Sequence, residues 1–170
     1  GELIVPIWHE QFNAIYRNRQ IPPASWKEAI ITLITKPNKD PTKVDSYRPI
    51  SLLNTDYKIY TGILAGRLAK VIKQVINPDQ KGFIPTRQLN DLTHCLISPI
   101  DIAVTNMARL AIITIDAAKA FDQVNWEYLW RVLEKMCFPA QFITAVKTLY
   151  KAPTAQLVIN GRLSNSIKIT

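Results

Sequence analysis

Residues 109–122 read RLAIITIDAAKAFD. The first seven, residues 109–115, are a near-continuous apolar run rich in strand-favouring residues, which is typical of a strand buried on both faces. The run ends at Asp116, and a carboxylate at the end of a buried strand projects from a rigid base where a divalent cation can be held. The same side chain could instead cap the following turn or be the acceptor aspartate of a doubly wound fold. Spacing alone leaves these readings open.

Upstream of this stretch, two strands and two helices are predicted. A short helix over residues 7–19 stops before a pair of prolines, because proline disfavours the helical conformation of its predecessor. Strand patterns follow at residues 27–36 and 48–53, joined by a basic, proline-containing turn, so the two strands face each other. Residues 56–76 place apolar side chains on one helical stripe, and the helix ends at Asn77 and Pro78.

Downstream, residues 125–135 and 139–151 predict two amphipathic helices, with Asn125 as a helix cap and Pro139 as a first helical residue. Residues 88–106 are also helical in pattern, but Pro99 predicts a kink or two short helices there. Asn160-Gly161, flanked by strand-like runs, is the strongest short hairpin signal a sequence offers. The sequence therefore predicts an α+β fold.

The charge of the chain is strongly positive and unevenly placed. The 170 residues carry 21 Lys and Arg against 13 Asp and Glu, a net charge of +8, and the excess falls between Arg17 and Arg87. Such a surface attracts polyanions such as nucleic acid. A hydrophobic content of 48% is enough for a core, which excludes a disordered or collagen-like chain.

Several classes of function lack support. Cys95 and Cys137 form no CxxC motif, and neither is separated from a histidine by the spacing that zinc ligands show. Neither a zinc site nor a disulfide framework is therefore indicated. The GxSxG, GxxxxGK[ST] and GxGxxG motifs are missing from the sequence. No segment reads as a membrane span or a signal peptide, so we expect a nuclear or cytoplasmic protein that is not secreted and has no membrane partner.

Four ordered motifs carry a family resemblance. They are WKEAIITLITKPNKDP (26–41), SYRPISLLNTDYKIYTGILAGRL (46–68), NPDQKGFIPTRQ (77–88) and DAAKAFDQVNWEYL (116–129). In this order and at these separations they resemble the fingers and upper palm of reverse transcriptases from LINE-type non-LTR retrotransposons. The resemblance implies a partial right-hand polymerase fold, with a fingers-like subdomain over 1–107 and an upper palm subdomain over 108–170. The basic hairpin would belong to the fingers and the strand ending in Asp116 to the palm.

The resemblance implies roles for residues after the palm strand. Asp116 matches the family's first catalytic aspartate, which would bind both Mg²⁺ ions of two-metal nucleotidyl transfer. The carbonyl of Ala117 would be a further ligand of the nucleotide-bound ion. Phe121 matches the steric-gate position, where an aromatic ring would collide with a ribose 2′-hydroxyl; without the resemblance it reads equally as a core aromatic. Asp122 stays outside the metal set.

The fingers motifs imply contacts with nucleotide and template. Lys36 and Arg48 match residues that grip the incoming triphosphate, for which a planar guanidinium and a mobile ammonium are suited. Lys39 and Lys43 read instead as a solvated basic loop. The third motif implies contacts with the template strand or the nucleotide, through Gln80, Gly82, Phe83, Arg87 and Gln88. Phe83 could equally be a core residue.

The sequence also departs from the family. Thr86 stands where a glycine is usual, which would alter a tight turn, and Ala118 replaces a glutamate. No Tyr-Ala-Asp-Asp or Phe-Ala-Asp-Asp motif is present, so two of three metal-binding aspartates are missing. We therefore expect a fragment of an RNA-directed DNA polymerase that does not polymerise alone.

The expected partners are an RNA template, a DNA primer or target, and dNTP. The alternative is a non-catalytic nucleic-acid-binding or protein-interaction module derived from such an enzyme. Because the strand at 109–115 would lack its usual neighbours, we expect self-association, pairing with the missing polymerase half, or a terminal hairpin (154–169) that folds over it.

Overall fold

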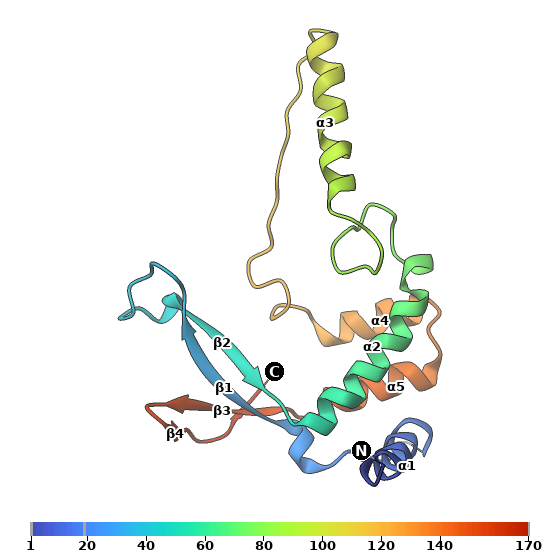
Figure 1. Ribbon diagram of the computed structural model, residues 1–170, viewed down its shortest axis with the longest axis vertical. Helices are drawn as coiled ribbons and strands as arrows, with labels where there is room; N and C mark the ends of the chain where they lie inside the picture. The colour runs from blue at the N-terminus through green and yellow to red at the C-terminus, as the bar shows by residue number, and fades with distance from the viewer. Residues whose placement is uncertain (1, 19, 170) are drawn as a thin grey trace. The chain divides into compact units, whose positions relative to one another are not determined.

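The structure, a computed structural model, describes residues 2–18 and 20–169 (Figure 1). The chain divides into two compact units, one formed by Gly1–Gly62 with Leu129–Thr170 and the other by Ile63–Tyr128. We call them the sheet unit and the central unit and describe each by itself. This division does not test the predicted boundary between a fingers-like and a palm subdomain after residue 107, which stays a prediction.

The structure is a mixed α+β fold, as the sequence predicts. Its helices and strands begin and end as follows: α1 Ile4–Asn18, β1 Glu28–Thr35, β2 Tyr47–Leu52, α2 Thr55–Val75, α3 Asn90–Thr105, α4 Trp126–Lys135, α5 Ala140–Leu149, β3 Thr154–Ile159, β4 Arg162–Leu163 and β5 Ile167–Lys168. Two short 3-10 turns, Ala24–Lys27 and Val44–Ser46, precede β1 and β2. The predicted helices other than the one at residues 88–106 are confirmed to within a few residues; Arg19, the last residue of the first, lies outside the described part of the chain.

The strands form one sheet in the order β2-β1-β3-β4, with β5 also paired to β3. β1 and β2 are antiparallel, with Ile34 opposite Arg48, which confirms the predicted facing strands. β3 and β4 form the predicted hairpin, and its turn residues Asn160 and Gly161 have φ of 50° and 75°. Positive φ at both positions matches the twist of the flanking strands. β3 lies parallel to β1, with Ala29 opposite Ala155, a pairing that sequence reasoning did not predict.

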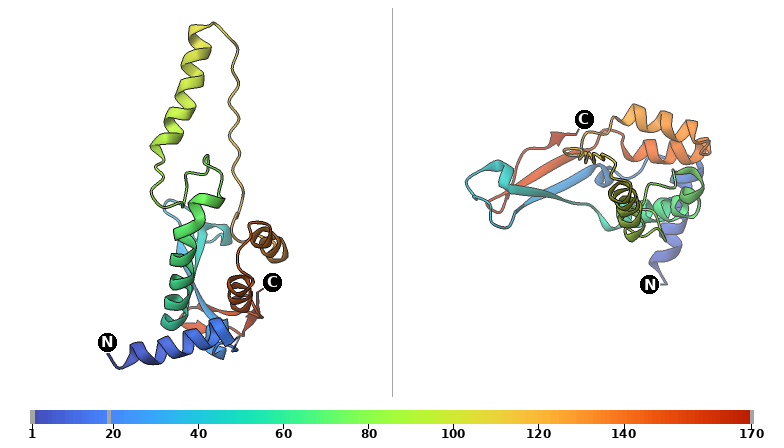
Figure 2. Two further views of the ribbon diagram at one scale, coloured as in Figure 1. Left: turned by 90° about the vertical axis from the view of Figure 1, so that its right-hand side faces the viewer. Right: turned by 90° about the horizontal axis from the view of Figure 1, so that it is seen from above.

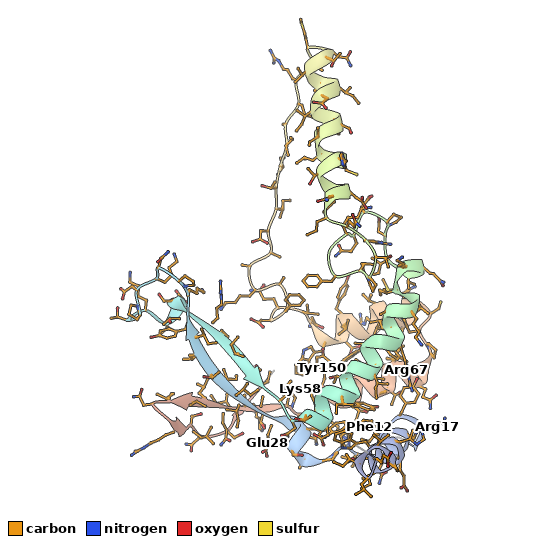
Figure 3. The ribbon with its side chains drawn as sticks, viewed as in Figure 1. Phe12, Arg17, Glu28, Lys58, Arg67 and Tyr150 are labelled. Carbon is orange, nitrogen blue, oxygen red and sulfur yellow. The ribbon has the colours of Figure 1, made fainter. Side chains whose placement is uncertain are left out.

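Aromatic side chains form the core of the sheet unit. The ring centroids of Trp26 and Tyr60 lie 5.2 Å apart, and those of Phe12 and Tyr60 lie 5.3 Å apart. The indole Nε1 of Trp26 donates a hydrogen bond of 2.6 Å to Oδ2 of Asp56, so its buried polar atom is satisfied. Phe12 reaches this cluster from α1, as the labelled side chain shows (Figure 3). Packing of these rings therefore joins α1, the approach to β1 and the first turns of α2.

A second part of the same core lies on α4 and α5, which run side by side (Figures 1 and 2). Trp130 of α4 packs edge-on against Tyr150, with ring centroids 5.2 Å apart. Phe142, Ile143 and Ala145 of α5 are buried. Gln141 donates a hydrogen bond of 3.3 Å to the carbonyl of Tyr16, which connects α5 to α1.

The predicted buried strand at residues 109–115 is not formed. Residues 108–117 have no regular secondary structure, and the side chain of Ile113 is 82% exposed. A strand needs a hydrogen-bonded neighbour. Among the described strands, β1 pairs with β2 and β3, and β3 pairs with β4 and β5, so none pairs with this segment. The prediction of a buried palm strand ending in Asp116 is wrong for this structure.

The helix that contains Pro99 is a single element. α3 runs from Asn90 to Thr105 with Pro99 inside, so the alternative of two short helices is wrong. None of the residues of α3 is buried. Water can therefore reach the carbonyl that Pro99 leaves without its helical donor. In the part of the chain described, no helix has the length and apolar character that crossing a bilayer requires.

Candidate nucleotide and nucleic-acid site

Lys36 and Arg48 lie at the same end of the β1–β2 hairpin. Arg48 stands opposite Ile34, two residues before Lys36 along the facing strand. The backbone N–H of Lys36 donates a hydrogen bond of 2.7 Å to the carbonyl of Ser46, which continues the ladder past the end of β1. The antiparallel pairing therefore brings together two of the residues expected to hold phosphate, and both belong to the sheet unit.

The side chain of Lys36 is held in place by its own loop. Its ammonium donates a hydrogen bond of 2.7 Å to the carbonyl of Asp45. An ammonium has three N–H donors, so this contact leaves others for an anion. Arg48 is exposed, and its guanidinium adds a planar fork of donors to the same end of the hairpin. A phosphate group is the ligand that such a pair of cations suits.

A loop joins β1 and β2 at the tip of this hairpin (Figure 1). Asp40 lies in this loop and orders it through two hydrogen bonds. Its Oδ1 accepts hydrogen bonds from the backbone N–H and the hydroxyl of Thr42, at 2.9 and 2.7 Å. These two bonds hold the pKa of the Asp40 carboxyl below its ordinary value, with the hydroxyl bond the larger cause. Lys39 and Lys43 of the loop are exposed, which agrees with their reading as solvated charges.

In the central unit, Arg87 is engaged with backbone. Nη1 donates to the carbonyls of Asn77 and Gln80 at 2.7 and 2.6 Å. Nη2 donates to those of Lys73 and Ile76 at 3.4 and 3.2 Å. The carbonyls at the end of a helix lack intrahelical donors, and a cation there also interacts favourably with the helix dipole. Arg87 thus caps the end of α2 and closes the loop that follows it.

The neighbouring motif residues are divided between this loop and the solvent. The side-chain Nε2 of Gln80 donates a hydrogen bond of 3.0 Å to the carbonyl of Gly82. Gln88 is exposed just before α3, and its carbonyl accepts a bond from the N–H of Asp91. Thr86 has a φ of 68°. This is the left-handed region that favours glycine and strains a β-branched residue. Thr86 therefore lies in a turn where glycine would fit without strain, at the position where the sequence departs from the family's usual glycine.

Phe83 and Phe121 meet within the central unit. Their ring centroids lie 6.0 Å apart with an interplanar angle of 85°, an edge-to-face pair. The residues are 93% and 81% exposed, so the core reading is wrong for both. Sequence reasoning placed each ring in a different motif and did not predict their contact. No local signal could have found it, because the pair joins positions far apart in the chain.

Asp116 and Ala117 are exposed in the irregular segment that precedes a turn. Within residues 2–18 and 20–169, no three Asp, Glu, His or Cys side chains gather closely enough to hold a metal ion. A two-metal centre needs several ligands around two ions about 3.5–4 Å apart. The donor set of the described residues therefore does not fit a complete two-metal site.

Taken separately, the two units offer a pair of cations at the end of a β hairpin and an exposed pair of aromatic rings. Phosphate and a planar base are the groups that these features can bind. The class of protein they indicate is one that binds nucleotides or nucleic acid. The chain belongs to the reverse transcriptase (RNA-dependent DNA polymerase) family, which matches residues 34–169 and confirms the resemblance drawn from the four motifs.

Three relatives have names from mobile elements. The chain is 31% identical over 159 residues to the transposon TX1 uncharacterized 149 kDa protein of Xenopus laevis, covering 94% of this chain and 12% of that protein. It is 32% identical to the RNA-directed DNA polymerase from mobile element jockey of Drosophila melanogaster, over 84% of this chain and 16% of that protein. The probable RNA-directed DNA polymerase from transposon BS of the same fly is also 32% identical, with 81% and 15% covered. The chain thus spans less than a fifth of each relative.

Proposed function

We propose that this chain is the fingers and upper palm part of an RNA-directed DNA polymerase from a non-LTR retrotransposon. The observation that carries the proposal is the placement of Lys36 and Arg48 at one end of the β1–β2 hairpin, within a chain of the reverse transcriptase family. In the parent enzyme, working in the nucleus or cytoplasm, the primer 3′-oxygen bonds to the α-phosphorus of dNTP. Pyrophosphate leaves, and the hydroxyl proton is lost.

Lys36 and Arg48 are proposed to bind the phosphates of the incoming nucleotide. The ammonium of Lys36 already points a donor at the carbonyl of Asp45, so phosphate oxygens would engage its remaining donors or replace that carbonyl. Arg48 would bind two phosphate oxygens through its planar guanidinium. Both contacts would stabilise the negative charge that develops on the departing pyrophosphate.

Phe121 is proposed to exclude the ribose 2′-hydroxyl, and Asp116 with the carbonyl of Ala117 to contribute metal ligands in the longer parent polymerase. Mg²⁺ is the proposed metal of that parent polymerase. Since the described donors do not fit a complete metal centre, we assign no catalytic step to this chain. RNA template and DNA primer or target are its proposed macromolecular partners, through the excess of basic residues that the sequence places between Arg17 and Arg87.

The second candidate is a nucleic-acid-binding module without polymerase activity. The irregular, exposed segment that carries Asp116 favours it, because catalysis needs carboxylates held in fixed positions. Primer extension separates the two roles. The purified chain should incorporate no nucleotide with Mg²⁺ or Mn²⁺, and template-dependent extension free of contaminating polymerase would contradict this.

Binding to labelled oligonucleotides tests the phosphate-binding role. The wild-type chain should lose affinity as salt increases, by roughly 0.7–0.9 log units per log unit of salt for each phosphate neutralised. The double variant Lys36→Ala with Arg48→Ala should bind less tightly and with a shallower salt slope. Lys39→Ala with Lys43→Ala is the matched control, since it removes the same charge from the tip of the same hairpin. If both double variants weaken binding equally, the hairpin is only a diffuse positive surface.

A further inference from the structure

The Phe83–Phe121 pair leaves most of both rings uncovered. In an edge-to-face pair, the edge of one ring contacts the face of the other. At 93% and 81% exposure, the remaining faces are open to solvent. Phenylalanine side chains are usually buried in folded proteins, so two of them exposed side by side are unusual. An interacting group that covers them would regain this lost burial.

The loop that carries Phe83 is held against reorganisation. Arg87 closes it through four carbonyls, and Gln80 bonds the carbonyl of Gly82 immediately before Phe83. Phe83 itself has a φ of 62°, a region that a bulky residue rarely adopts. Such strain persists only where the surroundings impose it, and it is found at functional sites. The loop therefore presents this ring outward in a fixed manner.

We propose that Phe83 and Phe121 form a stacking site for an unpaired base of single-stranded nucleic acid, with Phe83 as the residue that contacts the base. The inference rests on the proposed function, because the positively charged chain must first attract the strand. Every nucleobase has a π face that can stack on an aromatic ring, so this contact is tolerant of sequence. A duplex offers fewer free faces, since its bases already stack on each other.

A protein partner fits the pair less well. Two phenylalanine side chains bury about 150–250 Å² each, whereas a stable protein interface buries at least about 1,000 Å². One base needs only the face of one ring. The net charge of +8 also favours a polyanion over a neutral protein surface.

The test uses the whole chain and three fluorescent ligands of equal length: single-stranded DNA, the same backbone with abasic positions, and duplex DNA. Wild type should prefer the strand that has bases. Phe83→Leu keeps an apolar side chain and the β-carbon but removes the aromatic face, and it should weaken single-strand binding roughly tenfold. Its affinity for the abasic backbone should equal that of wild type. Phe121→Leu should weaken single-strand binding in the same direction.

Tyr128→Leu is the matched control, since Tyr128 is another exposed aromatic residue of the central unit, and its affinity should be unchanged. Phe83→Tyr should restore binding, which separates loss of the ring from damage to the fold. If Phe83→Leu binds the single strand like wild type, or if wild type binds the abasic backbone as tightly, the stacking site is wrong and the proposed function stands. If wild type binds none of the three ligands, the nucleic-acid-binding function itself is wrong.

Discussion

Nη1 of Arg87 lies 2.6 Å from the carbonyl oxygen of Gln80, and this contact closes the loop between α2 and α3. Sequence reasoning assigned both residues to template or nucleotide contacts, but the guanidinium is used on backbone carbonyls. These four bonds hold the loop that carries the motif, and the contacts of Arg87 and Gln80 with template or nucleotide stay a prediction.

Arg87→Ala should therefore loosen the loop. Hydrogen bonds from a charged donor contribute about 1.5–3 kcal/mol each, and partial exposure of this group reduces their sum to about 2 kcal/mol of local opening free energy. Amide hydrogen exchange of residues 76–83 should accelerate roughly thirtyfold. Arg87→Lys should recover only part of the protection, because one ammonium cannot reproduce the fork. The exposed Arg109→Ala is the control, and equal exchange in both alanine variants would contradict the role.

Thr86→Gly should stabilise the chain. The φ of 68° strains a threonine, whereas glycine adopts it freely. Relief of this strain stabilises the folded chain, whereas the greater conformational entropy of glycine stabilises the unfolded chain. Because the first effect is larger, the free energy of unfolding should rise by about 1 kcal/mol. Urea denaturation measures the change. Val104→Gly, which replaces another β-branched residue within α3, should instead destabilise, and a loss of stability in both variants would show that Thr86 is not strained.

Tyr57 should make stability depend on pH in the alkaline range. Burial, and secondarily the nearby Tyr150, raise the pKa of the Tyr57 hydroxyl above its ordinary value. As pH rises, the unfolded chain therefore loses the Tyr57 hydroxyl proton before the folded chain does. The contribution of Tyr57 to the free energy of unfolding is complete below about pH 10 and is lost as pH rises further. Tyr57→Phe should flatten this decline in the free energy of unfolding. The exposed Tyr128→Phe should leave the decline unchanged; identical curves for wild type and Tyr57→Phe would exclude the effect.

The exposed segment at 109–115 should promote self-association. Its apolar side chains and unpaired backbone can add to another chain as a strand. Ile113→Lys should shift a concentrated sample toward monomer in light scattering after size exclusion, since a lysine on a strand edge blocks pairing. Val104→Lys on α3 is the control, as it adds the same charge at another exposed position. A wild-type chain that stays monomeric at high concentration would rule out this pairing.

Local signals in the sequence determined most of the secondary structure. The turn at Asn160-Gly161, the β1–β2 hairpin and the helices α2, α4 and α5 depend on nearby residues, whose φ preferences and apolar spacing act over a few positions. Motif order likewise sufficed to recognise the reverse transcriptase family. The sequence also indicated the turn at Thr86, because threonine stands there in place of the glycine that is usual in the family.

Tertiary structure decided the contacts between distant segments. The parallel pairing of β1 with β3, the capping of α2 by Arg87 and the meeting of Phe83 with Phe121 each join residues whose local patterns do not refer to each other. The segment at 109–115 shows the converse. Its composition favours a strand, but a strand forms only when another supplies hydrogen bonds, and none of the described strands pairs with this segment.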